Sequence, residues 1–472
     1  MRAICLLTLS LLTLTGCGSK SESPAKAGIP LSIKNPGAKE AGKEAAKETA
    51  AQKATPPGEE QEQAIAAPAV ESLIKRARTA VVVGKPMLAV EALSQAIGVS
   101  PDNARLFRLR GDVYAMLGQD ANAKVDYSLA VKLAPRDAEL RNVRGYFLMS
   151  RGLTDQASED LQRATQLDPS MSTAWNNLGL VALAKKDYAT AEKRFSQALK
   201  TDDDYVDAFN NRGFVRFKQQ KNETALADLK MAVKLNKDYA SAWNNIGLVQ
   251  MSLKDYEAAI AAFDETVRLA PMDARWLGHR RAALLKLDRF EAAAADADRI
   301  RWLSNLDELT RQSMQNSGDP ESWIRRAKYL AKGSEFGAAV QDYSRALAVN
   351  PGNIEALNGR ALALLRMGKY QQAIADCDES LVSTETMEAF SIRADAWAGV
   401  GNYAQAVKDY DAAQRLDDLV ATAYRKYAEQ LREAGETEQA ADVEARLKTI
   451  TEALSGVRKA QAEALPFPEI KE

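Results

Sequence analysis

The chain has 472 residues, of which 46% are hydrophobic and 27% are charged, an ordinary balance for a folded protein. Its 63 lysines and arginines are matched by 64 aspartates and glutamates, so the net charge of −1 gives no basic excess of the kind that indicates nucleic-acid binding. The single histidine, His279, excludes a metal site built from several histidines and leaves one candidate for histidine acid/base catalysis.

Residues 1–16 are predicted to be an export signal. The basic residue Arg2 precedes an apolar run that is too short to cross a bilayer as a mature helix. The run closes with Leu14-Thr15-Gly16-Cys17, which resembles the lipobox of bacterial lipoproteins. That resemblance implies that Cys17 becomes the first mature residue and carries acyl chains that anchor it to a membrane. An ordinary cleaved signal followed by an unrelated cysteine is the alternative.

Residues 17–69 are predicted to be the lipidated cysteine and a disordered tether. They are rich in Ala, Lys, Glu, Pro and Gly and have too few large apolar side chains to form a core. Residues 39–54 contain strong helix formers and are expected to be partly helical. As a coil the tether would span roughly 40 Å, which would separate the folded part from its membrane.

From residue 70 onward one alanine recurs with a period of 34 residues that is broken only twice. Such a period is typical of one two-helix unit copied along the chain, with each copy packing against the next. The alanine marks the expected point where two antiparallel helices approach too closely for a larger side chain. The eleven alanines are Ala89, Ala123, Ala157, Ala191, Ala225, Ala259, Ala293, Ala339, Ala373, Ala406 and Ala440.

A second position, 12 residues before each alanine, is glycine or alanine in every unit except the seventh, which has Arg281. One unit reads Trp175-Asn176-Asn177-Leu178-Gly179, followed by Ala191 and Phe195. These residues resemble the tetratricopeptide repeat. The resemblance implies an all-α superhelical solenoid of about eleven helix-turn-helix repeats. It also implies that the first helices line a concave face that binds protein or peptide partners.

The largest break in the period separates Arg281 from Ala327, which are 46 residues apart instead of 34. We therefore predict repeats 1–7 over residues 70–305 and repeats 8–11 over residues 320–453. Residues 306–319 between them are predicted to be an insertion or joint that lengthens a helix or adds a loop. Residues 454–472 are predicted to be a C-terminal cap and tail, in which Leu465-Pro466-Phe467-Pro468 covers the last apolar face.

Comparison of the repeats with one another predicts a recurring ion pair. In seven units an arginine precedes the small position of the first helix, and an aspartate lies sixteen residues later. Where the first residue is apolar, at Leu178 and Ile246, the aspartate is absent as well, although Arg76 lacks one too. We expect partly buried, bidentate pairs that are structural, with anion binding as the alternative role. The pairs are Arg110–Asp126, Arg144–Asp160, Arg212–Asp228, Arg280–Asp296, Arg326–Asp342, Arg360–Asp376 and Arg393–Asp409.

Paired asparagines in three successive first helices form the first candidate binding surface. They resemble the asparagine ladders with which some tetratricopeptide proteins hold a peptide backbone, since an amide donates and accepts hydrogen bonds together. In the alternative interpretation, the second asparagine of each pair bridges adjacent helices. In the seventh unit His279 takes the place of that second asparagine. The pairs are Asn176 with Asn177, Asn210 with Asn211, and Asn244 with Asn245.

Two apolar rows beside the asparagines form the second candidate surface. An exposed apolar surface next to amides would suit an amphipathic helix or an extended apolar segment of a partner. The alternative is that the second row only packs between neighbouring helices. The first row is Tyr146, Leu180, Phe214 and Leu248, and the second row is Met149, Leu183, Phe217, Met251 and Leu285.

No motif supports catalysis or a cofactor: the chain has no phosphate-binding glycine loop, nucleophile elbow or cluster of metal ligands. Cys377 aligns with Tyr127 and Phe195 of other repeats and is expected to be a small buried residue. We therefore predict a protein that is not an enzyme and that needs no cofactor.

The predicted function is a membrane-anchored scaffold or adaptor of the bacterial envelope that binds a protein or peptide on its concave face. Gly18 and Ser19 lack the aspartate that retains many lipoproteins in the inner membrane, so the outer membrane facing the periplasm is favoured. Lipid-anchored proteins of this family take part in pilus assembly and in outer-membrane biogenesis. Others are adaptors that bring substrates to periplasmic proteases or cell-wall hydrolases. The alternative is a structural protein that assembles into homo-oligomers.

Overall fold

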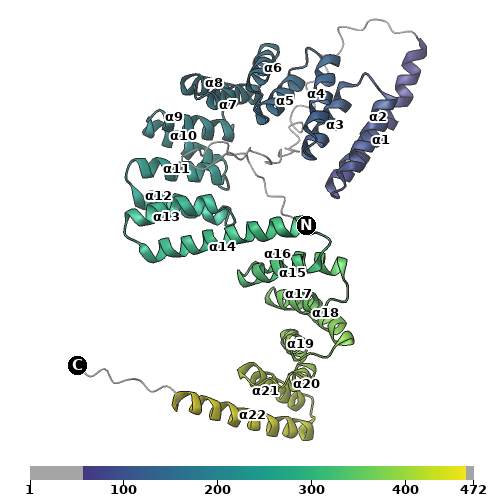
Figure 1. Cartoon of the computed structure of the whole chain (residues 1–472), viewed down its shortest axis with the longest axis vertical. Coiled ribbons are helices and arrows are strands. Elements are labelled where there is room, and N and C mark those ends of the chain that lie inside the picture. Colours follow the sequence, from purple (N-terminus) through teal and green to yellow (C-terminus); the bar gives the residue numbers. More distant parts are fainter. Residues whose placement is uncertain (1–56, 464–472) are drawn as a thin grey trace. The chain divides into compact units, whose positions relative to one another are not determined.

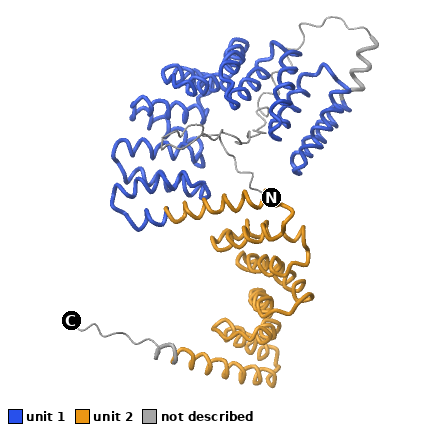
Figure 2. Tube along the Cα trace, in the orientation of Figure 1, with its two compact units in different colours: residues 1–296 blue, residues 297–472 orange. Residues whose placement is uncertain are grey.

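The computed structural model describes residues 57–463, which form 22 α-helices and no strand (Figure 1). The helices are antiparallel pairs, and the eleven pairs confirm the predicted all-α repeat architecture. The chain divides into two compact units, Met1–Asp296 and Ala297–Glu472 (Figure 2).

Unit 1 contains six complete helix pairs, the first helix of the seventh pair and the beginning of its second helix. The helices are α1 (Pro57–Val82), α2 (Pro86–Val99), α3 (Ala104–Met116), α4 (Asp120–Leu133), α5 (Ala138–Ser150), α6 (Thr154–Leu167), α7 (Ser172–Ala184), α8 (Tyr188–Thr201), α9 (Val206–Lys218), α10 (Asn222–Leu235), α11 (Ala240–Ser252), α12 (Tyr256–Leu269), α13 (Ala274–Lys286) and α14 (Phe290–Gln315).

Unit 2 contains the rest of α14 and four further pairs. The helices are α15 (Pro320–Lys332), α16 (Phe336–Val349), α17 (Ile354–Arg366), α18 (Tyr370–Ser383), α19 (Met387–Gly399), α20 (Tyr403–Ala412), α21 (Asp418–Glu433) and α22 (Thr437–Glu463).

The two helices of each repeat pack through the recurring small residues. All eleven periodic alanines are buried, and nine of them have no exposed surface. The small residue of the first helix lies against the large residue sixteen positions later. A Cβ on Gly179 would lie 2.5 Å from the Phe195 ring, and one on Gly247 would lie 2.4 Å from the Phe263 ring. Glycine is therefore required there because any side chain would displace a core aromatic ring.

The turn between the two helices holds one residue in the left-handed region in every repeat. Gly118 has φ +70°, as the sequence predicts for a glycine that ends a helix. In five successive repeats, however, a side chain adopts this strained conformation. These residues are Lys186, Gln220, Lys254, Asp288 and Ser334.

The break in the period is a helix extension. α14 has 26 residues, whereas the second helices before it have 14. Within unit 2, Trp302 of α14 stacks on Tyr329 of α15 with ring centroids 5.4 Å apart, and Leu306 joins the apolar cluster of α15 and α16. The division between units falls after Asp296, inside α14, whereas the predicted joint was 306–319. Residues 297–315 thus take the place of a preceding second helix for unit 2.

The seventh repeat reverses the usual order of small and large residues. Arg281 occupies the small position of α13 and is exposed, and the residue sixteen positions later is Ala297 instead of an aromatic ring or leucine. Because Ala297 is small, no core side chain needs the space that glycine provides in the other repeats.

The tether prediction needs one correction. Residues 57–69 were expected to be disordered, but α1 begins at Pro57. Proline is favoured in the first turn of a helix. The signal, Cys17, residues 39–54 and the segment Leu465–Pro468 lie outside the described residues. Within residues 57–463, no helix is long and apolar enough to cross a membrane.

Candidate functional site

The first helices of the repeats form the inner surface of each unit. In unit 1 they contact one another directly, α5 with α7, α7 with α9, α9 with α11 and α11 with α13. Direct contact between alternate helices requires the first helices to converge. Side chains that repeat along them therefore form rows on one surface, as the sequence predicts.

The structure forms all seven predicted arginine–aspartate pairs, each with two parallel hydrogen bonds. In the third repeat Arg144 Nε and Nη2 donate to the two carboxylate oxygens of Asp160, both at 2.6 Å. In unit 2 the Arg360 guanidinium binds Asp376 at 2.8 and 2.7 Å. The aspartates are buried, and the arginines are at most about a quarter exposed. Each pair joins the first helix of a repeat to its own second helix.

These hydrogen bonds fix the charge of the pairs. The bonds to Asp126 raise the pKa of Arg110 above its usual value, and the bonds to Asp376 do the same for Arg360. Because each carboxylate is buried and uses both oxygens for its arginine, this geometry supports a structural role over anion binding.

The fourth repeat, which lacks the aspartate, has a different interaction at that position. Arg194, which stands where the aspartate is expected, lies over the Trp175 ring at 5.4 Å from its centroid.

The seven pairs differ in how many other groups they contact. Asp228 receives a further hydrogen bond from Arg216 at 2.8 Å, so its pairing with Arg212 is not isolated. Arg360–Asp376 is the better pair for a quantitative test.

The asparagines bind one another across neighbouring repeats. Asn211 Nδ2 donates to Asn176 Oδ1 at 3.0 Å, and Asn245 Nδ2 donates to Asn210 Oδ1 at 2.9 Å. Asn177 makes the same bond to Asn142 at 2.8 Å. These bonds agree with the alternative interpretation, in which the second asparagine of each pair bridges adjacent helices.

The asparagine ladder is therefore a correction to the predicted peptide site. Asn176, Asn177, Asn210 and Asn244 are between 3 and 8% exposed, and their amides are used within the fold. Asn211 and Asn245 are half-buried and donate to these neighbours. A buried amide that already has a partner gains nothing from binding a peptide backbone.

His279 ends the ladder in α13. Its Nδ1 lies 2.7 Å from Asn244 Oδ1, so Nδ1 carries the proton and donates. The ring lies beside Phe263 and Trp276, with centroids 5.8 and 6.2 Å away. Burial, followed by the charge of Arg275, lowers the pKa of His279 below its usual value. The histidine is thus a neutral structural residue at neutral pH.

In unit 2 the ladder is absent. Asn358 is 3% exposed and its Oδ1 has no hydrogen-bond partner among the described residues. The position that would donate to it in the next repeat is Ile392. The ladder is therefore a property of unit 1.

The apolar rows remain accessible. Tyr146, Leu180, Phe214 and Leu248 are all half-buried, and the last three also pack against the core. In the second row Leu183 is 5% exposed and belongs to the core, whereas Leu285 is 41% exposed. Phe217, Met149 and Met251 are half-buried. All three also pack against the core clusters, so the alternative in which the second row packs between helices fits every residue of the row except Leu285.

A polar cluster beside these rows was not anticipated from the sequence. Tyr239, which precedes α11, donates its hydroxyl to Asp207 of α9 at 2.6 Å. Burial and the charge of Asp207 raise the pKa of Tyr146, so this tyrosine stays protonated. The two residues that form the bond are 32 apart, a spacing that differs from the repeat period and gave no signal in the repeat comparison.

Cys377 is fully buried, as expected for a small core residue. Burial and the charge of Asp376 raise the pKa of its thiol to about 12, which keeps it protonated and unreactive. Within residues 57–463 no three His, Cys, Asp or Glu side chains are grouped so that they could hold a metal ion.

A family model for the tetratricopeptide repeat matches residues 74–138, 144–206, 210–274 and 324–387, which is more than half of the chain. The chain belongs to the tetratricopeptide repeat family. Repeats of this family generally mediate interactions between proteins.

Individual tetratricopeptide proteins are similar over limited regions. Hsp70-Hsp90 organizing protein 3 of Arabidopsis thaliana is 40% identical over 50 residues, which cover 11% of this chain and 9% of that protein. The structure of PilF from Pseudomonas aeruginosa is 20% identical with a TM-score of 0.40, and the match covers 48% of this chain and 98% of PilF. The structure of PilW, a type IV pilus biogenesis factor, is 17% identical with a TM-score of 0.41, over 46% of this chain and 98% of PilW.

Proposed function

We propose that this protein is a non-enzymatic scaffold of the bacterial cell envelope that binds a segment of another protein on the inner surface of unit 1. The observation that carries the proposal is the row Tyr146, Leu180, Phe214 and Leu248. These residues hold the same position in four successive first helices and stay half-buried, although the surrounding positions are in the core. A row of partly exposed apolar side chains favours binding of an apolar segment of a partner.

The row is local to repeats three to six. Its position is occupied by charged residues in several other repeats, for example Asp112 in α3, Lys328 in α15 and Asp395 in α19, although the ninth repeat has Leu362 there. Lys218 lies over the rings of Phe214 and Phe217 at 5.1 and 5.6 Å and covers part of both. A partner that displaced this lysine would gain both aromatic faces.

Capture of partners from detergent-solubilised membranes tests this surface. Phe214→Ser combined with Leu248→Ser removes the centre of the row, and Val125→Ser, at a residue of α4 that is 58% exposed, is the matched control. We expect the control to retain the proteins that co-purify with the wild type and the double variant to lose them, with equal helix content by circular dichroism. Unchanged capture by a folded double variant would remove the inner surface from the account.

The envelope location is part of the same proposal and rests on the sequence Leu14-Thr15-Gly16-Cys17. We propose that acyl chains on Cys17 hold the protein at the outer membrane, facing the periplasm. Palmitate labelling of wild type and Cys17→Ser tests this, with label and membrane retention expected in the wild type alone. An unlabelled wild type would refute the anchor while leaving the binding surface untouched.

A further inference from the structure

Unit 2 contains a cavity of about 600 Å³ between α15, α16 and α17, a volume typical of ligand pockets. Apolar side chains line its interior, with Phe336 and Tyr343 from α16 and Leu362 from α17. Two cationic residues, Lys332 at the end of α15 and Arg366 at the end of α17, complete the lining. None of these residues belongs to the proposed surface of unit 1.

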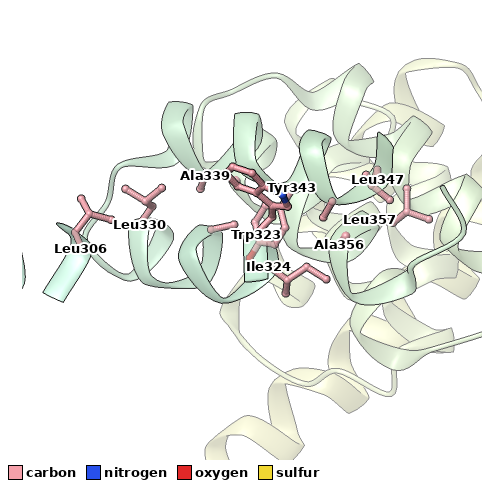
Figure 3. Packing of buried hydrophobic residues seen from close by; sticks show 12 residues of the cluster. Leu306, Trp323, Ile324, Leu330, Ala339, Tyr343, Leu347, Ala356 and Leu357 are labelled. Atoms are coloured by element: carbon pink, nitrogen blue, oxygen red, sulfur yellow. The ribbon is translucent and has the colours of Figure 1, made fainter. Parts of the chain in front are cut away.

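One glycine, Gly359, lies in the lining of the cavity. Gly359 holds the position that carries the bridging asparagine in unit 1, and it contributes no side chain. The hydroxyl-bearing end of the Tyr343 ring lies directly against Gly359, since a Cβ on Gly359 would be 2.4 Å from Tyr343 Cζ. In Figure 3 Tyr343 lies with Trp323 and Ile324 in the adjoining apolar cluster. The floor of the cavity is thus supported by the core of unit 2.

The charges beside the cavity are unbalanced. Lys332 and Arg366 are exposed, and neither pairs with a carboxylate among the described residues. The nearby acidic residues have their own partners: Glu335 pairs with Arg299 at 2.7 Å, and Glu355 pairs with Lys328. The cavity therefore combines an apolar interior with two uncompensated positive charges at its edge.

We propose that this cavity binds an acidic segment of a partner polypeptide, which inserts one large apolar side chain and places flanking carboxylates against Lys332 and Arg366. An apolar side chain would cover Phe336 and Leu362, and the carboxylates would supply the missing negative charge. The proposal is independent of the inner surface of unit 1 and holds whether or not that surface binds a partner.

A polypeptide suits the cavity better than a fatty acid does, although both combine a carboxylate with apolar groups. The two charges come from different helices, α15 and α17, so they match two carboxylates flanking a side chain. A fatty acid has one carboxylate and a long chain that needs an enclosed apolar channel. Lauric acid therefore serves as the competing ligand in the test.

The test uses fluorescence polarisation with the full detergent-solubilised chain and a labelled peptide Glu-Glu-Phe-Glu-Glu, blocked at both ends. Lys332→Glu with Arg366→Glu reverses both charges, and Lys408→Glu with Lys459→Glu reverses two exposed lysines of α20 and α22 as the matched control. We expect the first double variant, but not the control, to bind the peptide at least about tenfold more weakly. Peptides with Ala for Phe, or with Gln for every Glu, should be weakened similarly.

Three results would overturn the proposal. The first is equal binding by the two charge-reversed proteins, and the second is lauric acid binding more tightly than the peptide. The third is self-association of the wild type, seen by light scattering, that the Lys332→Glu/Arg366→Glu variant alone loses, because it would assign the surface to a second copy. A Leu362→Ser variant, at a residue 38% exposed, separates loss of apolar contact from loss of charge and should also weaken binding.

Discussion

The arginine–aspartate pairs connect the two helices of a repeat through side chains that are almost withdrawn from water. Arg326–Asp342 is the most buried, with 10 and 1% of the side chains exposed. Removing one partner leaves a charge without compensation, whereas replacing both with apolar residues removes the requirement. These pairs therefore stabilise the fold mainly by excluding arrangements in which either partner is alone.

A double-mutant cycle on Arg360 and Asp376 measures this coupling. We expect Asp376→Ala to lower the free energy of unfolding by about 2–3 kcal/mol, less than for a fully buried pair because the Arg360 side chain is 21% exposed. Arg360→Met with Asp376→Leu should cost less than the sum of the single changes in urea titrations. Arg194→Met, which removes only a cation–π contact, is the control and should cost at most about 1 kcal/mol. Additive single changes would show that the pair is not coupled.

The strained turns predict a substitution that stabilises the protein. Lys254 has φ +62° at a turn position where six of the repeats have glycine, so Lys254→Gly should raise the free energy of unfolding by about 0.5–1 kcal/mol. Gly118→Ala, at φ +70°, is the converse change and should lower it by about 1 kcal/mol. Thermal unfolding of both variants checks the signs. A destabilising Lys254→Gly would mean that the lysine makes a compensating contact.

His279 gives the protein a pH dependence of defined sign. Because burial lowers its pKa in the folded state, the unfolded chain binds the proton more readily. Stability is therefore complete above the unfolded pKa of about 6.5 and falls as the pH is lowered toward the folded pKa. His279→Asn keeps a donor for Asn244 and cannot titrate, so it should lose less stability than the wild type between about pH 7 and pH 5. Parallel losses in urea titrations would contradict this.

The ion pairs could be predicted from the sequence, but the partners of the asparagines could not. Seven arginines and seven aspartates vary together between repeats, so the chain itself shows which positions are in contact. Asn211 carries no such signal, since an amide bridges a neighbouring helix or a ligand with the same chemistry. The cavity beside Gly359 was not predicted, because it depends on where the Tyr343 ring lies.

Among the helices, α14 has a role that no other helix shares. Its first seven residues carry Ala293 and Asp296, which complete the seventh repeat, and its remaining residues carry Trp302 and Leu306, which pack in unit 2. The sequence predicted that extra residues near 306–319 lengthen a helix or add a loop, and the structure has the longer helix. The amino-acid composition of residues 297–315 does not by itself distinguish a continuous helix from a helix followed by a loop.

Truncation tests the role of α14. A fragment of residues 297–463 retains Trp302 and Leu306 against α15, whereas a fragment of residues 320–463 exposes Trp323 and Leu330 of the apolar cluster. We expect the longer fragment to unfold cooperatively and the shorter one to be less stable or to aggregate, as judged by circular dichroism and light scattering. Equal stability would show that α15 needs no preceding helix.

At the scale of the molecule, the two units present different surfaces although they are built from the same repeat. Unit 1 has a hydrogen-bonded asparagine ladder and a half-buried apolar row, and unit 2 has neither ladder nor row but has a cationic cavity. A repeat array allows this because each repeat contacts only its neighbours, and because the alanines and ion pairs hold the two helices of each repeat together. The remaining positions of the first helices are free to differ.

Site-specific photo-crosslinking tests the central claim most directly, that the inner surface of unit 1 holds a partner polypeptide. A photoreactive phenylalanine analogue would replace Leu180 or Leu248 on the inner surface, or Val125 of α4 as the control, in cells that produce the full chain. The account predicts a discrete crosslinked product from the two inner positions and none from the control. Crosslinking from Val125 alone, or from none of the three positions in a folded protein, would contradict it.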